Sequence, residues 1–138
     1  MGLYLCVFDE ADNELEGVEV GSYADFNFFR DAVVVAVENG KAGSVCPMLN
    51  THSDDDGKWE SEDARHLLTE LSQIAEVMRR YPPSELNSEW KKEAAKTFGI
   101  SPNTLLDCFF DIDGEPLVER LRELAKVSIS SGQPILFQ

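Results

Sequence analysis

Short runs of apolar residues along the chain predict the strands of a small sheet. The run at Leu3–Phe8 is continuous and is ended by acidic residues, which is typical of a buried strand. Leu15–Val20 is a second strand or an ordered loop, and the apolar run at Pro134–Gln138 is expected to dock on the same sheet as a strand. Val45–Asn50 is a further candidate strand, although Pro47 restricts it to an edge or an irregular extension.

Apolar residues that recur every three or four positions predict about four helices. The expected helices run from about Tyr23 to Glu38, from Ser61 to the arginines at 79 and 80, from about Glu85 to Phe98, and from Pro116 to Gly132. Ser22 and Asp25 form a capping-box-like start for the first of them, and Ser61 is the expected cap of the second. Leu105–Phe110 is apolar as well, and the pattern leaves open whether it joins the sheet.

The order of these elements predicts the fold class. Strands are few and helices long, and they do not alternate in a regular strand–helix–strand rhythm, so we expect an α+β fold. This fold would hold a small sheet of about three to five strands packed with about four helices. With 138 residues, of which 43% are apolar, the chain is long enough for one core, which predicts a single domain over residues 1–138.

The net negative charge of the chain limits the classes of partner that it can bind. There are 26 acidic residues against 12 basic ones, and residues 1–63 alone carry 15 acidic and 3 basic side chains. A polyanion of this kind repels nucleic acid and anionic membrane surfaces, so we expect a basic protein as partner, with no nucleic acid and no membrane. The chain shows neither a membrane-spanning run nor a signal-peptide pattern, which predicts a cytoplasmic protein. Its oligomeric state stays open.

The loop His52–Trp59 is the densest polar cluster. In the register of a twelve-residue calcium loop, Asp54 and Asp56 fall at ligand positions, but His52 and Asp63 would stand where stronger calcium ligands are expected. An Asp-rich turn whose tryptophan anchors the loop on the core explains the same residues, so we assign no metal and no cofactor.

Enzyme signatures are weak in this sequence. No nucleophile elbow, phosphate-binding loop or dinucleotide-binding motif is present, and the three cysteines show no metal-ligand spacing. Cys108 could meet His52 or His66 only through the fold. We therefore assign no catalytic residue. The alternative function is a small metal-binding or cysteine-dependent enzyme that uses the His52–Asp56 loop.

Several segments in order resemble the immunity protein 70 family of bacterial polymorphic toxin systems. They are MGLYLCVFD, ELEGVEVGSYADFNFFRDAV, HSDDDGKW, DGEPLVERL and GQPILFQ, and together they run almost from end to end of the chain. The resemblance implies a small α+β protein encoded beside a delivered toxin, which it binds and neutralises. It transfers no individual contact residue.

The charge pattern and the resemblance together predict where the toxin binds. Many delivered toxins are nucleases with basic clefts, so an acidic surface could occupy such a cleft and raise the association rate. The predicted toxin-facing acidic residues are Glu14, Glu16, Glu19, Asp54, Asp55, Asp56, Glu60 and Asp63. Trp59 or Tyr23 is expected to serve as an apolar anchor.

Overall fold

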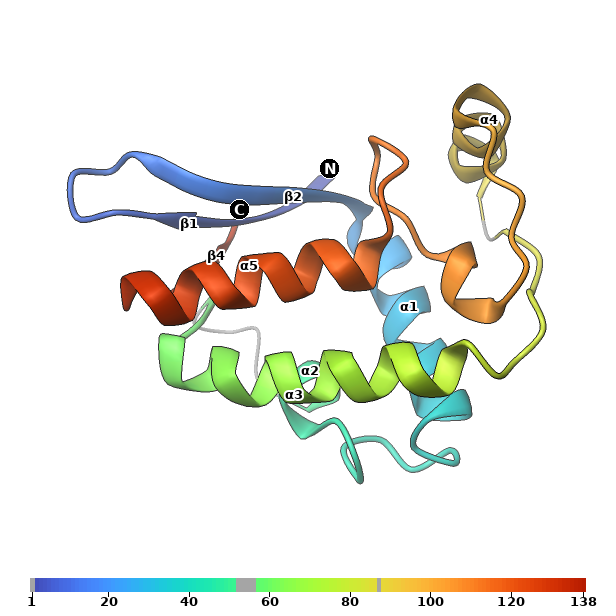
Figure 1. The fold of residues 1–138 in the computed structure, drawn as a ribbon, viewed down its shortest axis with the longest axis horizontal. Helices are drawn as coiled ribbons and strands as arrows, with labels where there is room; N and C mark the ends of the chain where they lie inside the picture. Colours follow the sequence, from blue (N-terminus) through green and yellow to red (C-terminus); the bar gives the residue numbers. More distant parts are fainter. Residues whose placement is uncertain (1, 52–56, 87) are drawn as a thin grey trace.

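The computed structural model describes residues 2–51, 57–86 and 88–138. Within them the chain forms an α+β fold with a four-stranded antiparallel sheet, which confirms the predicted class (Figure 1). The strands are β1 (Gly2–Phe8), β2 (Glu14–Ser22), β3 (Lys58–Trp59) and β4 (Ile135–Phe137), in the spatial order β2-β1-β4-β3. The helices are α1 (Tyr23–Ala36), α2 (Pro47–Asn50), α3 (Ser61–Met78), α4 (Glu89–Phe98), the 3-10 helix η1 (Leu105–Cys108) and α5 (Leu117–Ser131).

Strands β1 and β2 form a long hairpin, so the segment that includes Leu15–Val20 is a strand. The Asp9 carboxylate holds the turn by accepting hydrogen bonds from the backbone N–H groups of Ala11 and Asn13, at 2.9 and 2.8 Å. The bond from Asn13 is the main reason why the pKa of Asp9 is lowered. Asp12 adopts a positive φ of 63°, which closes the turn.

The helices pack on one side of the hairpin. In Figure 1, α5 lies directly below β1 and β2, α3 lies side by side with α5 on its far side, and α1 crosses behind both. The core between them contains fully buried side chains from every layer, including Leu5, Phe29, Leu71 and Leu121. The apolar faces of α1, α3 and α5 therefore share one core, whereas none of the described core residues comes from α4.

Helix α1 begins as the sequence predicts. The Ser22 hydroxyl accepts a hydrogen bond from the Asp25 N–H at 3.1 Å, and the Asp25 carboxylate accepts one from the Ser22 N–H at 2.9 Å. The helix ends at Ala36, slightly before the expected Glu38, and Asn39 follows with a positive φ of 54°. Helix α5 ends at Gly132 with a φ of 72°, as expected of a glycine at this position.

The strand expected at Val45–Asn50 is wrong, because this segment contains the short helix α2 instead. Two buried carboxylates explain the difference, since Glu38 accepts the N–H groups of Val45 and Cys46, and Glu70 accepts those of Met48 and Leu49. These side chains satisfy donors that a strand would have offered to a neighbouring strand. They lie 7 to 22 residues away from their partners, so the local pattern could not reveal them.

Two further expectations need correction. The third predicted helix begins at Glu89 and not near Glu85, and Phe98 at its end is 52% exposed. The second helix begins at Ser61, but its N-cap is Glu60. The open question about Leu105–Phe110 is also answered, because this segment forms η1 and then makes one isolated bridge, between Phe110 and Pro116.

No helix in the described parts of the chain combines the length and the apolar character needed to cross a membrane.

Candidate functional site

One face of the hairpin has no helix above it. In Figure 1 the upper side of β1 and β2 is open, whereas α5 covers the lower side. Side chains alternate between the two faces of a strand, and Leu3, Leu5 and Val7 of β1 are completely buried on the helix-covered side. Tyr4, Cys6 and Phe8 therefore belong to the opposite side. We call this side the open sheet face.

The strand register identifies the other members of the open sheet face. Residues directly opposite each other in an antiparallel pair project to the same side of the sheet. Tyr4 pairs with Glu19, Cys6 with Gly17 and with Leu136, and Phe8 with Glu14, while Leu136 also pairs with Lys58. The open sheet face thus consists of Tyr4, Cys6, Phe8, Glu14, Gly17, Glu19, Lys58 and Leu136.

Tyr4 and Glu14 are joined across this face. The Tyr4 hydroxyl donates a hydrogen bond to Glu14 Oε1 at 2.6 Å. This bond, burial and the negative charge of Glu14 raise the pKa of Tyr4 to about 12. Gly17 makes the arrangement possible, because a Cβ atom there would overlap the tyrosine ring and hydroxyl. The ring therefore lies across β2 and fixes the orientation of the glutamate.

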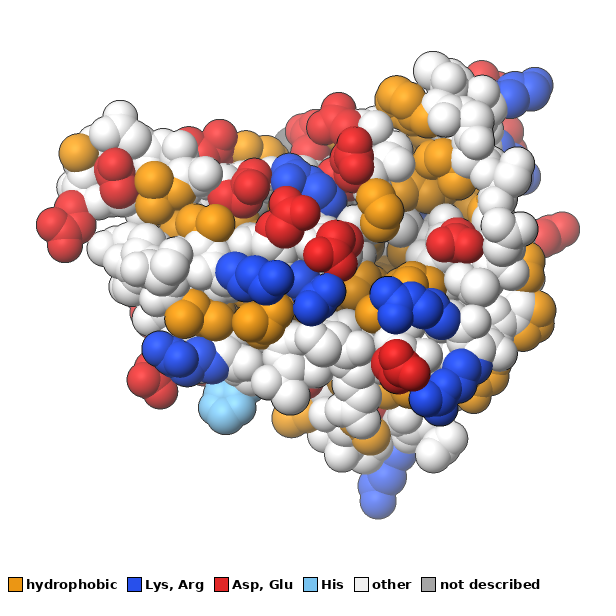
Figure 2. All heavy atoms as spheres, in the orientation of Figure 1, with side chains coloured by type: hydrophobic (Ala, Val, Ile, Leu, Met, Phe, Trp, Pro, Cys, Tyr) orange, Lys and Arg blue, Asp and Glu red, His pale blue; other side chains and the backbone are white. Residues whose placement is uncertain are grey.

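Five acidic residues of the hairpin form no ion pair within the described structure. They are Glu14 and Glu19 of the open sheet face and Asp9, Glu10 and Asp12 of the turn. None of the ion pairs found among the described residues includes any of these five carboxylates. Figure 2 shows acidic and hydrophobic side chains interspersed along this part of the surface. Their negative charge is left for solvent ions or for a partner.

Glu16 lies apart from its neighbours in sequence. It pairs with Val7, which places it on the helix-covered side, and its Oε1 lies 3.4 Å from an Arg120 guanidinium nitrogen on α5. The register shifts between Val7 and Phe8, so Glu14 and Glu16 fall on opposite faces although they are two residues apart. The three glutamates predicted to act together are therefore split between the two faces, with Glu16 in an ion pair.

Glu60 and Asp63 lie at the start of α3, immediately after β3 at the other edge of the sheet. Strands β1 and β4 separate them from β2, a distance of about 14 Å at about 4.8 Å per strand. Glu60 pairs with Lys58 at 2.9 Å, and Asp63 accepts the Glu60 N–H at 3.1 Å. In Figure 1 the start of α3 and the hairpin turn nevertheless lie at the same end of the molecule.

The two predicted aromatic anchors differ in exposure. Trp59 is only 1% exposed and packs edge-on against Phe137, with 4.7 Å between ring centroids. Its side chain belongs to the core, so it cannot be a surface anchor, whereas Tyr23 is 43% exposed. Asp54, Asp55 and Asp56, together with the whole His52–Asp56 loop, lie outside the described residues.

The described cysteines are poor nucleophiles in this environment. Burial raises the pKa of Cys6 to about 11 and that of Cys46 to about 12, and nearby glutamates add to both effects. Very little thiolate exists at neutral pH with such values. Cys108 is buried, with its sulfur 3.4 Å from the Ser84 carbonyl oxygen, while His66 is exposed on α3. Among the described residues no group of three or more His, Cys, Asp or Glu side chains could hold a metal ion.

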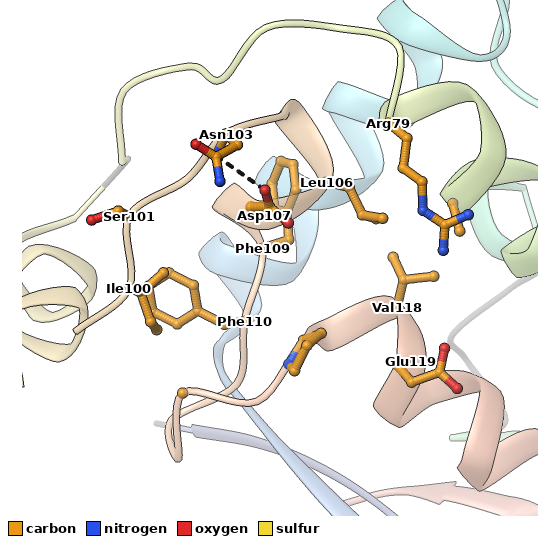
Figure 3. Close-up of a pocket in the computed structure, with 13 residues that line it drawn as sticks. Arg79, Ile100, Ser101, Asn103, Leu106, Asp107, Phe109, Phe110, Val118 and Glu119 are labelled. Carbon is orange, nitrogen blue, oxygen red and sulfur yellow. Dashed lines mark hydrogen bonds between the residues drawn. The ribbon is translucent and has the colours of Figure 1, made fainter. Parts of the chain in front are cut away.

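A groove that sequence reasoning missed opens between the end of α3, η1 and the start of α5 (Figure 3). Its volume is about 520 Å³. Most of the lining is apolar, with contributions from Ile100, Leu106, Phe110 and Val118. Three charged side chains also line it, namely Arg79, Asp107 and Glu119. The groove draws on four segments between residues 75 and 119, and no local pattern in the sequence connects them.

Comparison with known families gives one match. Residues 3–137 match the immunity protein 70 family. The chain belongs to this family. Searches of curated proteins and of solved structures gave no match.

Membership of the immunity protein 70 family defines the role in broad terms. The chain is an immunity protein, so its surface features are to be interpreted as parts of a protein that protects against a toxin. Two features described above are open to a partner. One is the acidic open sheet face with the hairpin turn, and the other is the groove beside α5.

Proposed function

We propose that this immunity protein binds a cognate toxin in the cytoplasm and neutralises it by contact, without a catalytic step of its own. The toxin would lie on the open sheet face and the hairpin turn. One observation carries the proposal, namely that Asp9, Glu10, Asp12, Glu14 and Glu19 line a half-apolar surface without a described cation beside them.

The composition of the open sheet face resembles that of a protein interface. Tyr4, Phe8 and Leu136 are partly buried and form an apolar strip across β1 and β4. Glu14 and Glu19 flank this strip on β2. Specific interfaces commonly have an apolar or aromatic centre and a polar rim, so a toxin surface could bury the strip and pair with the rim.

The charge of this surface selects a basic partner. Opposite charges on two approaching proteins raise the association rate by one to three orders of magnitude, and the gain falls as salt is added. An antidote gains from fast capture, because the toxin acts as long as it is free. A nuclease with a basic cleft would fit this surface. Glu60 and Asp63, at the same end of the molecule, would add to the negative field, and the predicted role of Asp54, Asp55 and Asp56 remains part of the proposal.

Recognition by side chains is favoured over the addition of a toxin strand to the sheet. Strand β2 is an edge strand, but two of its carbonyl groups already have partners outside the sheet. The Gly17 carbonyl accepts Arg120 Nη2 at 2.7 Å, and the Glu19 carbonyl accepts the Ile112 N–H at 3.1 Å. A new strand would have to break these bonds. The face of the hairpin is therefore a better contact surface than its edge.

Production of the chain together with the toxin encoded beside its gene tests the proposal. Cells that make the toxin domain should survive only when this chain is also made. Purified chain and an inactivated toxin domain should associate, and the association rate should fall at least tenfold between about 50 and 300 mM salt. Survival without complex formation, or an association rate that does not change with salt, would contradict binding through an acidic surface.

A further inference from the structure

The groove beside α5 is a second feature suited to a partner. Figure 3 shows Ile100, Leu106, Phe110 and Val118 directed toward a common space, with Arg79 and Glu119 at one side. On the face seen in Figure 2, hydrophobic side chains surround this hollow and charged side chains flank it. Ile100 and Leu106 are partly exposed, whereas Phe110 and Val118 are each only 2% exposed.

We infer that this groove receives an apolar side chain of the toxin that is followed or preceded by a lysine or arginine. The inference rests on the proposed function, because it takes the partner to be the same toxin. It adds a second contact region, which the acidity of the amino-terminal half of the chain does not indicate.

Charge complementarity determines the kind of segment that fits. Asp107 and Glu119 line the groove, and Glu119 forms an ion pair with Arg122 at 2.9 Å. Asp113 and Glu115 are exposed in the turn that supplies Gly114 and Pro116 to the groove wall. Arg79 is the only cation among the described lining residues, and it lies 3.9 Å from Glu76. An anionic segment would meet mostly carboxylates, whereas a cationic residue beside the apolar side chain would meet Asp107 and the exposed acidic turn.

The lining fits a protein side chain better than a small polar molecule. Small-molecule sites combine apolar walls with a few polar groups that are fixed and free to bind the ligand. In contrast, none of the described lining residues has a buried polar atom without a hydrogen-bond partner. The Asp107 carboxylate is already committed to the N–H groups of Asn103 and Thr104, at 3.0 and 3.1 Å. The groove therefore offers mainly apolar contact, which is what an anchoring side chain requires.

Phe98, the last residue of α4, lies next to Gly114 in the groove wall. The Phe98 ring is 52% exposed and packs against Gly114, whose φ is +79° and where a Cβ atom would collide with that ring. Phe98 thus extends the apolar surface beyond the groove. A toxin segment seated in the groove could cover this ring at the same time, which increases the apolar area removed from water.

Filling the groove tests the inference. Ser101 lines it and is exposed, so Ser101→Trp would place a large side chain at its mouth. Gln73→Trp puts the same side chain on an exposed part of α3 away from the groove and is the matched control. A second pair, Glu119→Lys and Glu93→Lys, tests the charge in the same way, since Glu93 is exposed on α4 and does not line the groove.

Binding of each variant to the inactivated toxin domain is measured by calorimetry, with thermal unfolding as the test of folding. We expect Ser101→Trp and Glu119→Lys to weaken binding by about tenfold or more, and the two controls to change it by less than about threefold. Unchanged affinity of the groove variants would overturn the inference, while the proposed function would stand as long as the wild-type chain binds. Absence of wild-type binding would instead reject the proposed function. If the wild-type chain forms dimers that Ser101→Trp dissociates, the occupant is a second copy and the inference is wrong.

Discussion

Acidic residues do two different things in two regions of this molecule. On the hairpin, Glu14 and Glu19 point away from the helices and have no described cation next to them. Elsewhere, Glu38, Glu70 of helix α3 and Asp111 are buried and accept backbone hydrogen bonds from loops and from the start of α2. The first group leaves its charge to the surroundings, whereas the second stabilises turns that lack a regular ladder of their own. The net charge alone therefore overstates the number of carboxylates that a partner could contact.

The comparison makes a clear prediction for each group. Replacing an inward carboxylate should lower the stability of the fold, and replacing an outward one should alter binding without altering stability.

Asp111→Ala should destabilise the chain by about 3 kcal/mol. Asp111 is 1% exposed, accepts the N–H groups of Asp113 and Glu115 at 3.0 Å each, and lies 3.4 Å from Arg120 Nε. The exposed Asp113 is the matched control, and its replacement by alanine should cost less than about 0.5 kcal/mol. Urea unfolding of the two variants measures the difference, and equal costs would contradict the structural role of Asp111.

Reversal of the outward pair, Glu14→Lys with Glu19→Lys, should slow toxin association about tenfold to hundredfold at low salt. The unfolding free energy should change by less than about 1 kcal/mol, because both side chains are exposed. The control with the same change in charge is Glu85→Lys with Glu93→Lys, both exposed and outside the hairpin. Stopped-flow kinetics distinguish the two pairs. If both slow association equally, net charge and not the open sheet face determines the rate.

Trp90→Phe should destabilise the attachment of α4 by about 1 kcal/mol. The indole N–H of Trp90 donates to Asp25 Oδ2 at 3.0 Å, so an inward carboxylate that caps α1 also holds α4. Phenylalanine keeps an aromatic ring near Phe110 but removes the donor. Amide hydrogen exchange should become faster in α4 and remain unchanged in α3, and equal protection of α4 in both proteins would show that the bond contributes nothing.

The smallest expected effect is the pH dependence of the unfolding free energy that Glu70 causes. Burial, with the nearby Glu38 as a further cause, raises the pKa of Glu70 above 4.5 despite the hydrogen bonds from Leu49 and Met48. Stability from this group is therefore fully present below about pH 4.5 and is lost as the pH rises through the folded-state pKa. Relative to Glu70→Gln, the wild type should become less stable between pH 4.5 and 8 in urea unfolding. A difference that stays constant with pH, as expected for the exposed Glu93→Gln, would contradict the raised pKa.

Elements with a strong local pattern could be predicted from the sequence. The strand at Leu3–Phe8, the capping box of Ser22 and Asp25, and the end of the last helix at Gly132 all depend on residues close together in the chain. What could not be predicted depends on contacts between distant residues. Segment Val45–Asn50 forms no strand because Glu38 and Glu70 bind its N–H groups.

The candidate site shows the same limit. The acidity of the hairpin is visible in the sequence, but the shift in register that turns Glu14 outward and Glu16 inward is not. The sequence left open whether Trp59 is a surface anchor or holds the polar loop on the core. The structure favours the second, because β3 pairs with β4 and the Trp59 ring is buried. The groove is invisible in the sequence, because its wall residues come together only through the packing of α3, η1 and α5.

Alternation along β1 has a consequence for how such a protein can change its specificity. Leu3, Leu5 and Val7 hold the fold together, while Tyr4, Cys6 and Phe8 between them face the other way. New side chains can therefore be tried at Tyr4 and Phe8 and at the exposed Glu14 and Glu19 of β2 while the interior remains the same, although Cys6 is itself completely buried. If a toxin mutates so that its immunity protein no longer binds, substitutions on the open sheet face could restore binding without changing the residues that stabilise the fold.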